Sequence, residues 1–286
     1  MDLQRIGVMG AGVIGTTVAQ DLAQTGHDVV LVDTTSEILA HALDEIASAA
    51  RFHHLVGGGE RQDVGQVTAR VHPTTDIASL AEVDYVIENV TEDRDVKRAV
   101  YTELDRVCPP ACVFAANTSV IPITTIASYT SRPENVVGIH FMNPVPLKSA
   151  VELIRGDLTS DRAIDTTETL LSQMNKRPIA VGDSPGFVSN RVLMQTINET
   201  VFLVQEAVAD PRDIDDVFTS CFGHKMGPLR TADLIGLDTI LRSIEELQIE
   251  LPNGRFQPCP LLRTMVDAGD LGQKSGRGFY TYEKET

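Results

Sequence analysis

Three glycines near the N-terminus have a spacing that suits the binding of phosphate groups. Gly10-x-Gly12-x-x-Gly15 follows a short apolar stretch at residues 5–9 and opens a segment with helical periodicity. Gly10 allows a tight turn, Gly12 leaves the backbone open to a pyrophosphate, and Gly15 lets the helix pack closely against the strand. The first turn of such a helix directs free N–H groups and the positive end of its dipole toward the phosphates. The residues expected at a dinucleotide are Gly10, Gly12, Val13, Ile14 and Gly15.

An acidic residue, Asp33, ends the apolar run at 28–33, about 20 residues beyond the glycines, as in dinucleotide-binding folds. A carboxylate at this position accepts hydrogen bonds from both ribose hydroxyls and repels a 2′-phosphate. Thr34 and Thr35 follow, and neither could neutralise such a phosphate as an arginine would. Alone, Asp33 would suit the N-cap of a helix. After the glycine loop, it predicts NAD rather than NADP as the cofactor.

His140 and Glu152 are suited to move a proton beside a nicotinamide. Oxidation of an alcohol requires a base that removes the hydroxyl proton while hydride leaves the carbon, and histidine titrates near neutral pH. A carboxylate on the other ring nitrogen would fix the tautomer and stabilise the imidazolium. Glu152 meets that need if residues 136–141 and 151–155 form neighbouring strands. A lone histidine at a strand end is more often structural, so the assignment depends on the glycine loop.

These polar residues must be brought together by a sheet, and the chain has the alternating pattern that builds one. Apolar stretches with β character alternate with helical periodicity, which is typical of a doubly wound, mainly parallel sheet with helices on both faces. Ligands of such a sheet bind at the carboxyl ends of the strands, where Ser119 and His140 also lie. The expected strands are 5–9, 28–33, 67–71, 84–90, 112–116, 136–141, 151–155 and 178–181, and the expected helices are 13–25, 36–55, 93–107, 123–129 and 161–175.

The pattern changes after Ser184-Pro185-Gly186, where the β signal stops. We therefore predict two domains, residues 1–184 with a Rossmann-type α/β fold and residues 185–286 built from helices. The wide apolar stripe at 187–208 suits a core, with part available for a dimer interface. The helices expected in the second domain are 187–208, 213–222, 230–248 and 260–268, and Gly57-Gly58-Gly59 is expected to end a long helix that projects from the first.

Composition argues against several classes of protein. A net charge of −16 over 286 residues makes nucleic acid an improbable partner, since phosphate backbones attract basic surfaces. No apolar run of about 18 residues predicts a membrane span. No charged and apolar leader precedes the first strand, so we expect a cytoplasmic protein. The four cysteines lack metal-ligand spacing with a nearby histidine, and no metal site is predicted.

Several motifs, in the same order, resemble the 3-hydroxyacyl-CoA dehydrogenases over nearly the whole chain. They are Gly10-x-Gly12-x-x-Gly15, Ala116-Asn117-Thr118-Ser119, Gly138-Ile-His140-Phe-Met-Asn143-Pro144-Val-Pro146, Val151-Glu152, Ser184-Pro-Gly186-Phe-Val-Ser-Asn190-Arg191, Met226-Gly-Pro228, Asp233-Leu-Ile-Gly-Leu-Asp238 and Gly272-Gln-Lys274-Ser-Gly276-Arg-Gly278-Phe279-Tyr280. The related β-hydroxyacid dehydrogenases use a lysine on a helix, but no Gly-x-x-x-Asn-x-x-Lys arrangement occurs after residue 160. The resemblance implies an NAD-dependent oxidoreductase that acts at C3 of a hydroxyacyl thioester in fatty acid or polyketide metabolism.

The resemblance also implies a role for each matching residue. His140 is implied as the general base, and Glu152 as its orienting partner. Ser119 is implied to bind the substrate oxygen near the nicotinamide, and Asn190 to help hold the carbonyl side of the substrate. Alone, Ser119 would be interpreted as a helix N-cap and Asn190 as a surface amide. The implied cofactor contacts include Glu92, Lys97, Asn117, Ser119 and Asn143, and the implied assembly is a homodimer.

Two departures from the family concern the carrier of the thioester. The stretch at 36–54, which is rich in lysine near the phosphates of coenzyme A in many members, holds Arg51 and no lysine. After the Asn-Pro motif, the lysine of Pro146-Leu147-Lys148-Ser149 is moved by one position. Both changes favour a second hypothesis, an acyl carrier protein as partner, as in the branch that acts on glyceryl-carrier substrates in polyketide extender-unit synthesis. Candidates for the basic patch that it would need are Arg51, Arg61, Arg70, Lys148 and Arg191.

Two further hypotheses follow from the same residues. The enzyme could act on a free hydroxy acid or sugar acid, which would also explain the missing lysines. The chain could instead be a non-catalytic NAD-binding structural or sensor protein, because a fold does not fix a function. The combination of His140, Glu152, Ser119 and Asn190 argues against that last hypothesis.

Overall fold

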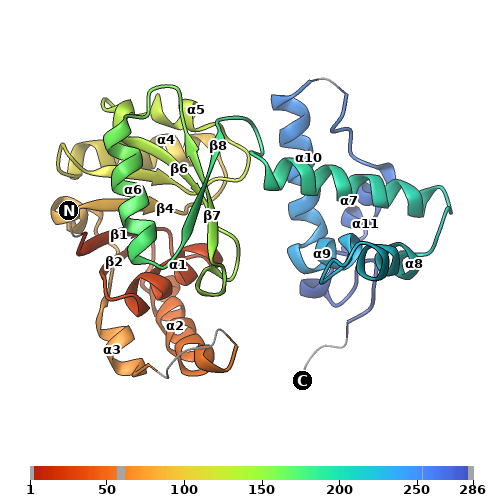
Figure 1. Cartoon of the computed structure of the whole chain (residues 1–286), viewed down its shortest axis with the longest axis horizontal. Helices are drawn as coiled ribbons and strands as arrows, with labels where there is room; N and C mark the ends of the chain where they lie inside the picture. Colours follow the sequence, from red (N-terminus) through yellow and green to blue (C-terminus); the bar gives the residue numbers. More distant parts are fainter. Residues whose placement is uncertain (1–2, 57–61, 253, 283–286) are drawn as a thin grey trace. The chain divides into compact units, whose positions relative to one another are not determined.

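The computed structural model describes residues 3–56, 62–252 and 254–282. The chain divides into two compact units, residues 1–184 and 185–286, each of which is described by itself (Figure 1). The first unit contains an eight-stranded sheet with flanking helices, and the second is built from helices and two isolated β-bridges. The fold class expected from the sequence, a Rossmann-type sheet followed by a helical region, is confirmed.

The sheet of the first unit has the strand order β3-β2-β1-β4-β5-β6-β7-β8. Neighbouring strands from β3 to β6 are parallel, whereas β7 is antiparallel to β6 and β8 is parallel to β7. The chain reverses its direction of winding at β1, which lies between β2 and β4, and this is where doubly wound sheets bind ligands. The strands are β1 Arg5–Met9, β2 Asp28–Val32, β3 Val71–Thr74, β4 Tyr85–Glu88, β5 Val113–Ala116, β6 Val136–His140, β7 Ala150–Arg155 and β8 Arg177–Gly182.

Helices cover both faces of this sheet. They are α1 Val13–Gln24, α2 Ser36–Val56, α3 Val64–Ala69, α4 Arg94–Val107, α5 Ile123–Ala127 and α6 Asp161–Gln173, with 3-10 turns η1 Ile77–Glu82, η2 Pro133–Asn135 and η3 Val145–Leu147. Successive side chains of β5 point to opposite faces. Val113 and Ala115 belong to the apolar cluster that includes Leu170 of α6. Phe114 instead meets Tyr101 of α4 edge to face, so α4 and α6 lie on opposite faces.

One strand was placed wrongly from the sequence. The strand expected at 67–71 is the end of α3 followed by the start of β3. Asp63 explains the helix, because its carboxylate accepts the backbone N–H of Gly65 at 2.8 Å and caps the first turn. β3 is an edge strand, where Pro73 is tolerated because its missing N–H faces away from β2.

The helical unit differs from expectation at one break. The single helix expected at 230–248 is divided at Gly236, whose φ of +104° suits only glycine. The helical period continues on both sides of this residue, which is why the sequence pattern hid the break. In the first unit, the expected end of a helix at Gly57-Gly58-Gly59 lies outside the described residues. The elements are α7 Ser189–Gln205, α8 Pro211–Asp216, a π-helical turn η4 Val217–Cys221, α9 Pro228–Ile235, α10 Leu237–Glu250, α11 Pro260–Asp267 and a 3-10 turn η5 Gln273–Ser275.

Two buried carboxylates organise the end of the helical unit. Asp215 accepts the N–H groups that open α9, including that of Leu229 at 2.8 Å. Asp233 accepts the backbone N–H groups of Phe279 and Tyr280, both at 3.0 Å. Burial raises the pKa of Asp233, while these hydrogen bonds oppose the rise. A side chain at Gly278 would place its Cβ 2.1 Å from an Asp233 oxygen, so the Gly-Phe-Tyr sequence serves this packing.

Candidate functional site

The glycine loop between β1 and α1 has the backbone geometry of a phosphate-binding turn. Gly10 has a φ of +94°, and a Cβ there would lie 2.9 Å from the backbone of Asn89. A Cβ on Gly15 would lie 1.8 Å from the Gly10 oxygen, so helix and strand are in direct backbone contact. Around Gly12 a Cβ would meet nothing within 4 Å, which leaves the helix N-terminus open to a ligand. Val13 is exposed and Ile14 half-buried in the first turn of α1.

Asp33 stands beside this loop at the end of β2. Its Oδ2 accepts the N–H of Ala11 at 2.6 Å, and its Oδ1 accepts the N–H of Thr34 at 2.6 Å. The carboxylate is therefore oriented toward the glycine loop before any ligand binds. A cleft of about 380 Å³ is lined by Gly12, Asp33, Ile38 and further residues at the ends of β1 and β4. An acidic rim, an apolar wall and an open glycine backbone fit the adenosine half of a dinucleotide.

The strands that carry His140 and Glu152 are neighbours, as expected. The two residues lie directly opposite each other in the antiparallel β6–β7 pair, so their side chains share one face of the sheet. The Nδ1 of His140 is 2.8 Å from Oε2 of Glu152, and the two side chains are 9 % and 8 % exposed. A carboxylate accepts hydrogen bonds only, so it places the ring proton on Nδ1 and makes Nε2 the basic nitrogen.

Ser119 meets that basic nitrogen from the segment after β5. Its Oγ lies 3.1 Å from Nε2 of His140. The hydroxyl donates to Nε2 in this tautomer, which leaves its own lone pairs directed elsewhere. The sequence places Ser119 and His140 21 residues apart, yet parallel pairing of β5 and β6 brings their strand ends side by side. Strands β7 and β6 and the segment after β5 thus contribute one chain of contacts, from Glu152 through His140 to Ser119.

Asn117 connects the ends of three strands. Its Nδ2 donates to Oδ1 of Asn89 after β4 at 2.8 Å, and its Oδ1 accepts the N–H of Phe141 after β6 at 3.2 Å. Asn89 in turn donates to the carbonyl of Ile87 at 3.1 Å. These contacts hold the carboxyl edge of the sheet together. The cofactor contact implied for Asn117 stays a prediction.

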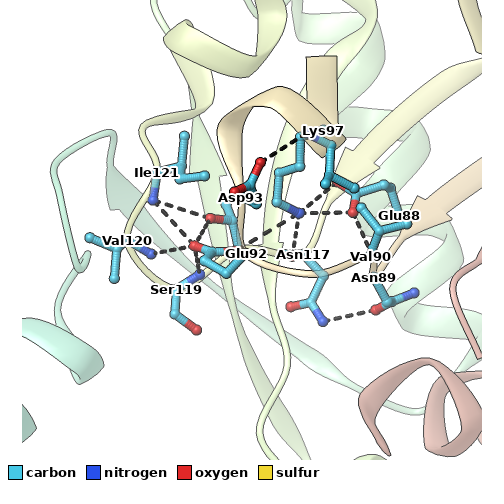
Figure 2. Close-up of polar contacts among 12 residues, drawn as sticks. Glu88, Asn89, Val90, Glu92, Asp93, Lys97, Asn117, Ser119, Val120 and Ile121 are labelled. Carbon is cyan, nitrogen blue, oxygen red and sulfur yellow. Dashed lines mark hydrogen bonds and ion pairs between the residues drawn. The ribbon is translucent and has the colours of Figure 1, made fainter. Parts of the chain in front are cut away.

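Glu92 and Lys97 lie at the same edge, and Figure 2 shows Glu92 between Lys97 and the segment Ser119–Ile121. Oε1 of Glu92 accepts hydrogen bonds from this segment, among them the N–H of Ser119 at 3.1 Å and of Val120 at 3.0 Å. Lys97 is fully buried, and its Nζ donates to both carboxylate oxygens of Glu88 at 2.8 and 2.9 Å. The cofactor contacts implied for Glu92 and Lys97 also stay predictions.

Glu88 is a member of this network that the sequence pattern did not single out. It ends the apolar strand β4 with no exposed surface, and burial raises its pKa against the opposing charge of Lys97. The available signal was an ionisable residue inside an apolar run, with a lysine nine residues later on the following helix. A buried carboxylate requires a partner, which such a lysine supplies.

The contacts described above do not include two other predicted residues, Asn143 and Asn190. Asn143 is exposed after β6, and Asn190 is a buried residue of α7 in the helical unit. Of the basic candidates, Arg70 donates to the carbonyl of Gly26 at 2.9 Å, and Arg61 lies outside the described residues.

Across residues 3–56, 62–252 and 254–282, no group of three metal-ligating side chains is found. In the same part of the chain, no helix has the length and apolar character to cross a membrane.

Two family models match consecutive parts of the chain. Residues 5–184 match the 3-hydroxyacyl-CoA dehydrogenase NAD binding domain, and residues 186–282 match the 3-hydroxyacyl-CoA dehydrogenase C-terminal domain.

Similar proteins span the full length of the chain. A probable 3-hydroxybutyryl-CoA dehydrogenase of Bacillus subtilis is 42 % identical, with 100 % of both chains covered. A 3-hydroxybutyryl-CoA dehydrogenase of Clostridioides difficile is 38 % identical over 98 % of this chain and 100 % of its own. The crystal structure of (S)-3-hydroxybutyryl-CoA dehydrogenase PaaH1 from Ralstonia eutropha has a TM-score of 0.92 at 39 % identity, covering 99 % of this chain and all of its own. That of FadB2 from M. tuberculosis has a TM-score of 0.95 at 36 % identity, covering 99 % and 100 %.

Proposed function

The chain belongs to the 3-hydroxyacyl-CoA dehydrogenase family, and we propose that it oxidises 3-hydroxybutyryl-CoA or a related short 3-hydroxyacyl-CoA with His140 as the general base. It is an NAD-dependent oxidoreductase that acts on a CH–OH group. The observation that carries the proposal is the aligned set Glu152, His140 and Ser119 at the carboxyl edge of a sheet whose glycine loop fits NAD.

Each residue of the set has a distinct part in the reaction. NAD, when bound, supplies the nicotinamide carbon that takes the hydride from C3 of the substrate. Nε2 of His140 removes the proton of the C3 hydroxyl as the hydride departs, and Glu152 stabilises the imidazolium that results. Ser119 donates a hydrogen bond to the substrate oxygen once that oxygen lies beside Nε2. In the reverse direction, protonated His140 returns the proton to the C3 oxygen.

Asn190 is proposed to bind the carbonyl side of the substrate, the role that the family resemblance implies. An amide supplies a hydrogen-bond donor for the thioester carbonyl without competing as a base. Asn190 is the second residue of α7 and is buried. Asn190→Ala should therefore raise KM for the thioester while leaving NAD affinity unchanged, as measured by initial rates and calorimetry.

Coenzyme A is proposed as the carrier of the acyl group, because the relatives from Bacillus subtilis, Clostridioides difficile and Ralstonia eutropha are named for a CoA thioester. The acyl carrier protein remains the competing partner, favoured by the scarcity of lysine at 36–54. Purified full-length protein should be assayed for NADH formation with one acyl group in three forms: CoA thioester, carrier-protein thioester and free acid. We expect the highest kcat/KM for the CoA thioester.

The other outcomes of this assay each identify a different function. Faster turnover of the carrier-protein thioester would establish the carrier hypothesis. Equal turnover of the free acid would show that the thioester handle is not required. Binding of NAD without turnover of any of the three would favour a structural or sensor role.

A homodimer is proposed from the exposed apolar residues of the helical unit. Val192 on α7 and Phe222 after the π-helical turn are 60 % and 65 % exposed, and exposed apolar side chains that form a patch mark protein–protein contacts. Self-association would bury them in a symmetric contact. Sedimentation should give twice the mass of one chain, and Val192→Glu should shift the population toward monomers. A monomeric native protein would refute this assembly.

A further inference from the structure

A single carboxylate oxygen holds the segment that carries Ser119. Oε1 of Glu92 accepts the hydroxyl of Thr118 at 2.5 Å and the backbone N–H groups of Ser119, Val120 and Ile121 at 3.1, 3.0 and 3.4 Å. Successive N–H groups that converge in this way form a concave site for one anionic oxygen. Here the chain fills that site with its own side chain.

The other oxygen of Glu92 faces a buried cation. Oε2 lies 3.8 Å from Nζ of Lys97, and that ammonium also donates to the carbonyl of Asn117 at 3.4 Å. Lys97 is fixed in turn by the two oxygens of Glu88 inside the sheet edge. With one oxygen near the ammonium, Glu92 has its remaining oxygen directed at the segment 118–121. Figure 2 shows this sequence of contacts from Glu88 to Ile121.

The segment places Ser119 where the proposed reaction needs it. Its Oγ lies 3.1 Å from the basic nitrogen of His140, which is itself fixed by Glu152. A displacement of about 1 Å in such a group lowers turnover by about 100-fold. The N–H of Ile121 also donates to the Thr118 hydroxyl at 3.2 Å. Loss of the Glu92 carboxylate would therefore remove the acceptor mainly of Ser119 and Val120, whose backbone N–H groups would have to find other partners.

We propose that Glu92 is a positioning residue that acts on the reaction through Ser119, an inference that rests on the proposed function. The alternative is a direct contact between Glu92 and the cofactor. The two differ in what removal of the carboxylate changes. Loss of a positioning residue lowers kcat and leaves NAD affinity unchanged, whereas loss of a cofactor contact weakens NAD binding.

The first test removes the carboxylate and then returns it. Glu92→Ala should lower kcat by about 10- to 100-fold and change the Kd for NAD by less than about 3-fold. The side chain of Glu92 is 28 % exposed, so solvent can reach the space it leaves. Acetate, which matches the missing CH₂–COO⁻ group, should restore part of the lost kcat, and an equal ionic strength of chloride should not. A weakened Kd for NAD with unchanged kcat would overturn the proposal.

A double-mutant cycle tests whether Glu92 acts through Ser119. If it does, Glu92→Ala combined with Ser119→Ala should be no slower than Ser119→Ala alone. Multiplied losses would overturn the proposal. The matched control is Glu103→Ala on α4, the helix that follows Glu92, because Glu103 pairs with Arg106 at the surface. Its kcat should equal that of the native chain, with or without acetate.

Backbone exchange provides a measurement that needs no substrate. The amide hydrogen of Val120, which donates to Glu92 at 3.0 Å, should be protected in the native chain, exchange faster in Glu92→Ala, and regain protection in acetate. Unchanged protection in Glu92→Ala would overturn the proposal even if the native chain turned over no hydroxyacyl thioester. Absence of turnover in the native chain, with the expected exchange, would overturn only the proposed function.

Discussion

Two buried pairs of a carboxylate with a basic side chain lie at the same edge of the sheet. They differ in solvent exposure and in whether the basic side chain has a second nitrogen that contacts another group. Glu152 contacts His140 at 2.8 Å, with side chains 8 % and 9 % exposed. Glu88 contacts Lys97 at the same distance, with no exposure of either side chain. The second nitrogen of His140 reaches the Ser119 hydroxyl at 3.1 Å, whereas the Lys97 ammonium is surrounded by protein oxygens.

We interpret this difference as one of function: the Glu152–His140 pair is proposed to transfer protons, and the Glu88–Lys97 pair to stabilise the fold. Histidine changes charge near neutral pH and has a second nitrogen for a reacting group. Lysine keeps its charge when a buried carboxylate balances it, at a desolvation penalty that only good geometry offsets. We therefore expect changes in the Glu152–His140 pair to act on turnover, and changes in the Glu88–Lys97 pair to act first on stability.

The largest expected effect is on stability, and it comes from a change in the Glu88–Lys97 pair. Lys97→Met leaves Glu88 buried without a counter-ion, which should lower the free energy of unfolding by about 3–5 kcal/mol. Urea unfolding followed by circular dichroism measures this change. The double variant Glu88→Leu with Lys97→Met removes both charges and should recover most of the loss. A Lys97→Met chain as stable as the native one would contradict the distinction between the pairs.

The proton-transfer pair should show the opposite response. His140→Gln should lower kcat by about 100-fold or more, since general base catalysis is lost. Its urea midpoint and its Kd for NAD should stay close to those of the native chain. Turnover within a few-fold of native would remove His140 from the mechanism.

Glu152→Gln should have a smaller effect on the same pair. The amide can still contact Nδ1, but it no longer stabilises the imidazolium or enforces the tautomer, so kcat should fall by about 10- to 100-fold. Because Glu152 acts through the ring, the change should add little when His140 is already Gln. Losses that multiply in the double variant would show an independent role for Glu152.

The pH dependence of stability sharpens the comparison further. Burial raises the pKa of Glu88, and the charge of Lys97 opposes this rise. A carboxyl whose pKa is raised by folding favours the folded state below its unfolded pKa, and the benefit is lost as pH rises through the folded pKa. The deficit of Lys97→Met should therefore grow between pH 5 and pH 8, by up to about 1.4 kcal/mol per pH unit. Glu88→Gln in the same background should abolish this slope, and a deficit independent of pH would argue against an uncompensated Glu88.

The sequence predicts the cofactor half of the site better than the catalytic half. The glycine loop and Asp33 are close in the chain, so their spacing carries the geometry. The pairing of His140 with Glu152 followed once residues 136–141 and 151–155 were expected to be neighbours, and the β6–β7 register confirms that adjacency. Their catalytic roles stay predictions.

Long-range contacts account for what the sequence did not predict. The bonds from Glu92 to residues 118–121 span 26 to 29 positions, and no periodicity encodes them. Glu88 lay inside the apolar strand expected at 84–90, and its partner Lys97 is on the following helix. The helix α3 and the break at Gly236 were missed because a local cap and one positive φ outweigh the apolar pattern.

The most direct measurement follows the hydride itself. 3-Hydroxybutyryl-CoA with deuterium at C3 should be incubated with NAD and the native chain, and the reduced cofactor analysed by mass spectrometry. Our account predicts that the NADH formed carries the deuterium, and that this transfer slows in His140→Gln at saturating NAD. NADH without deuterium, or no NADH at all, would contradict hydride transfer from C3 of a hydroxyacyl thioester.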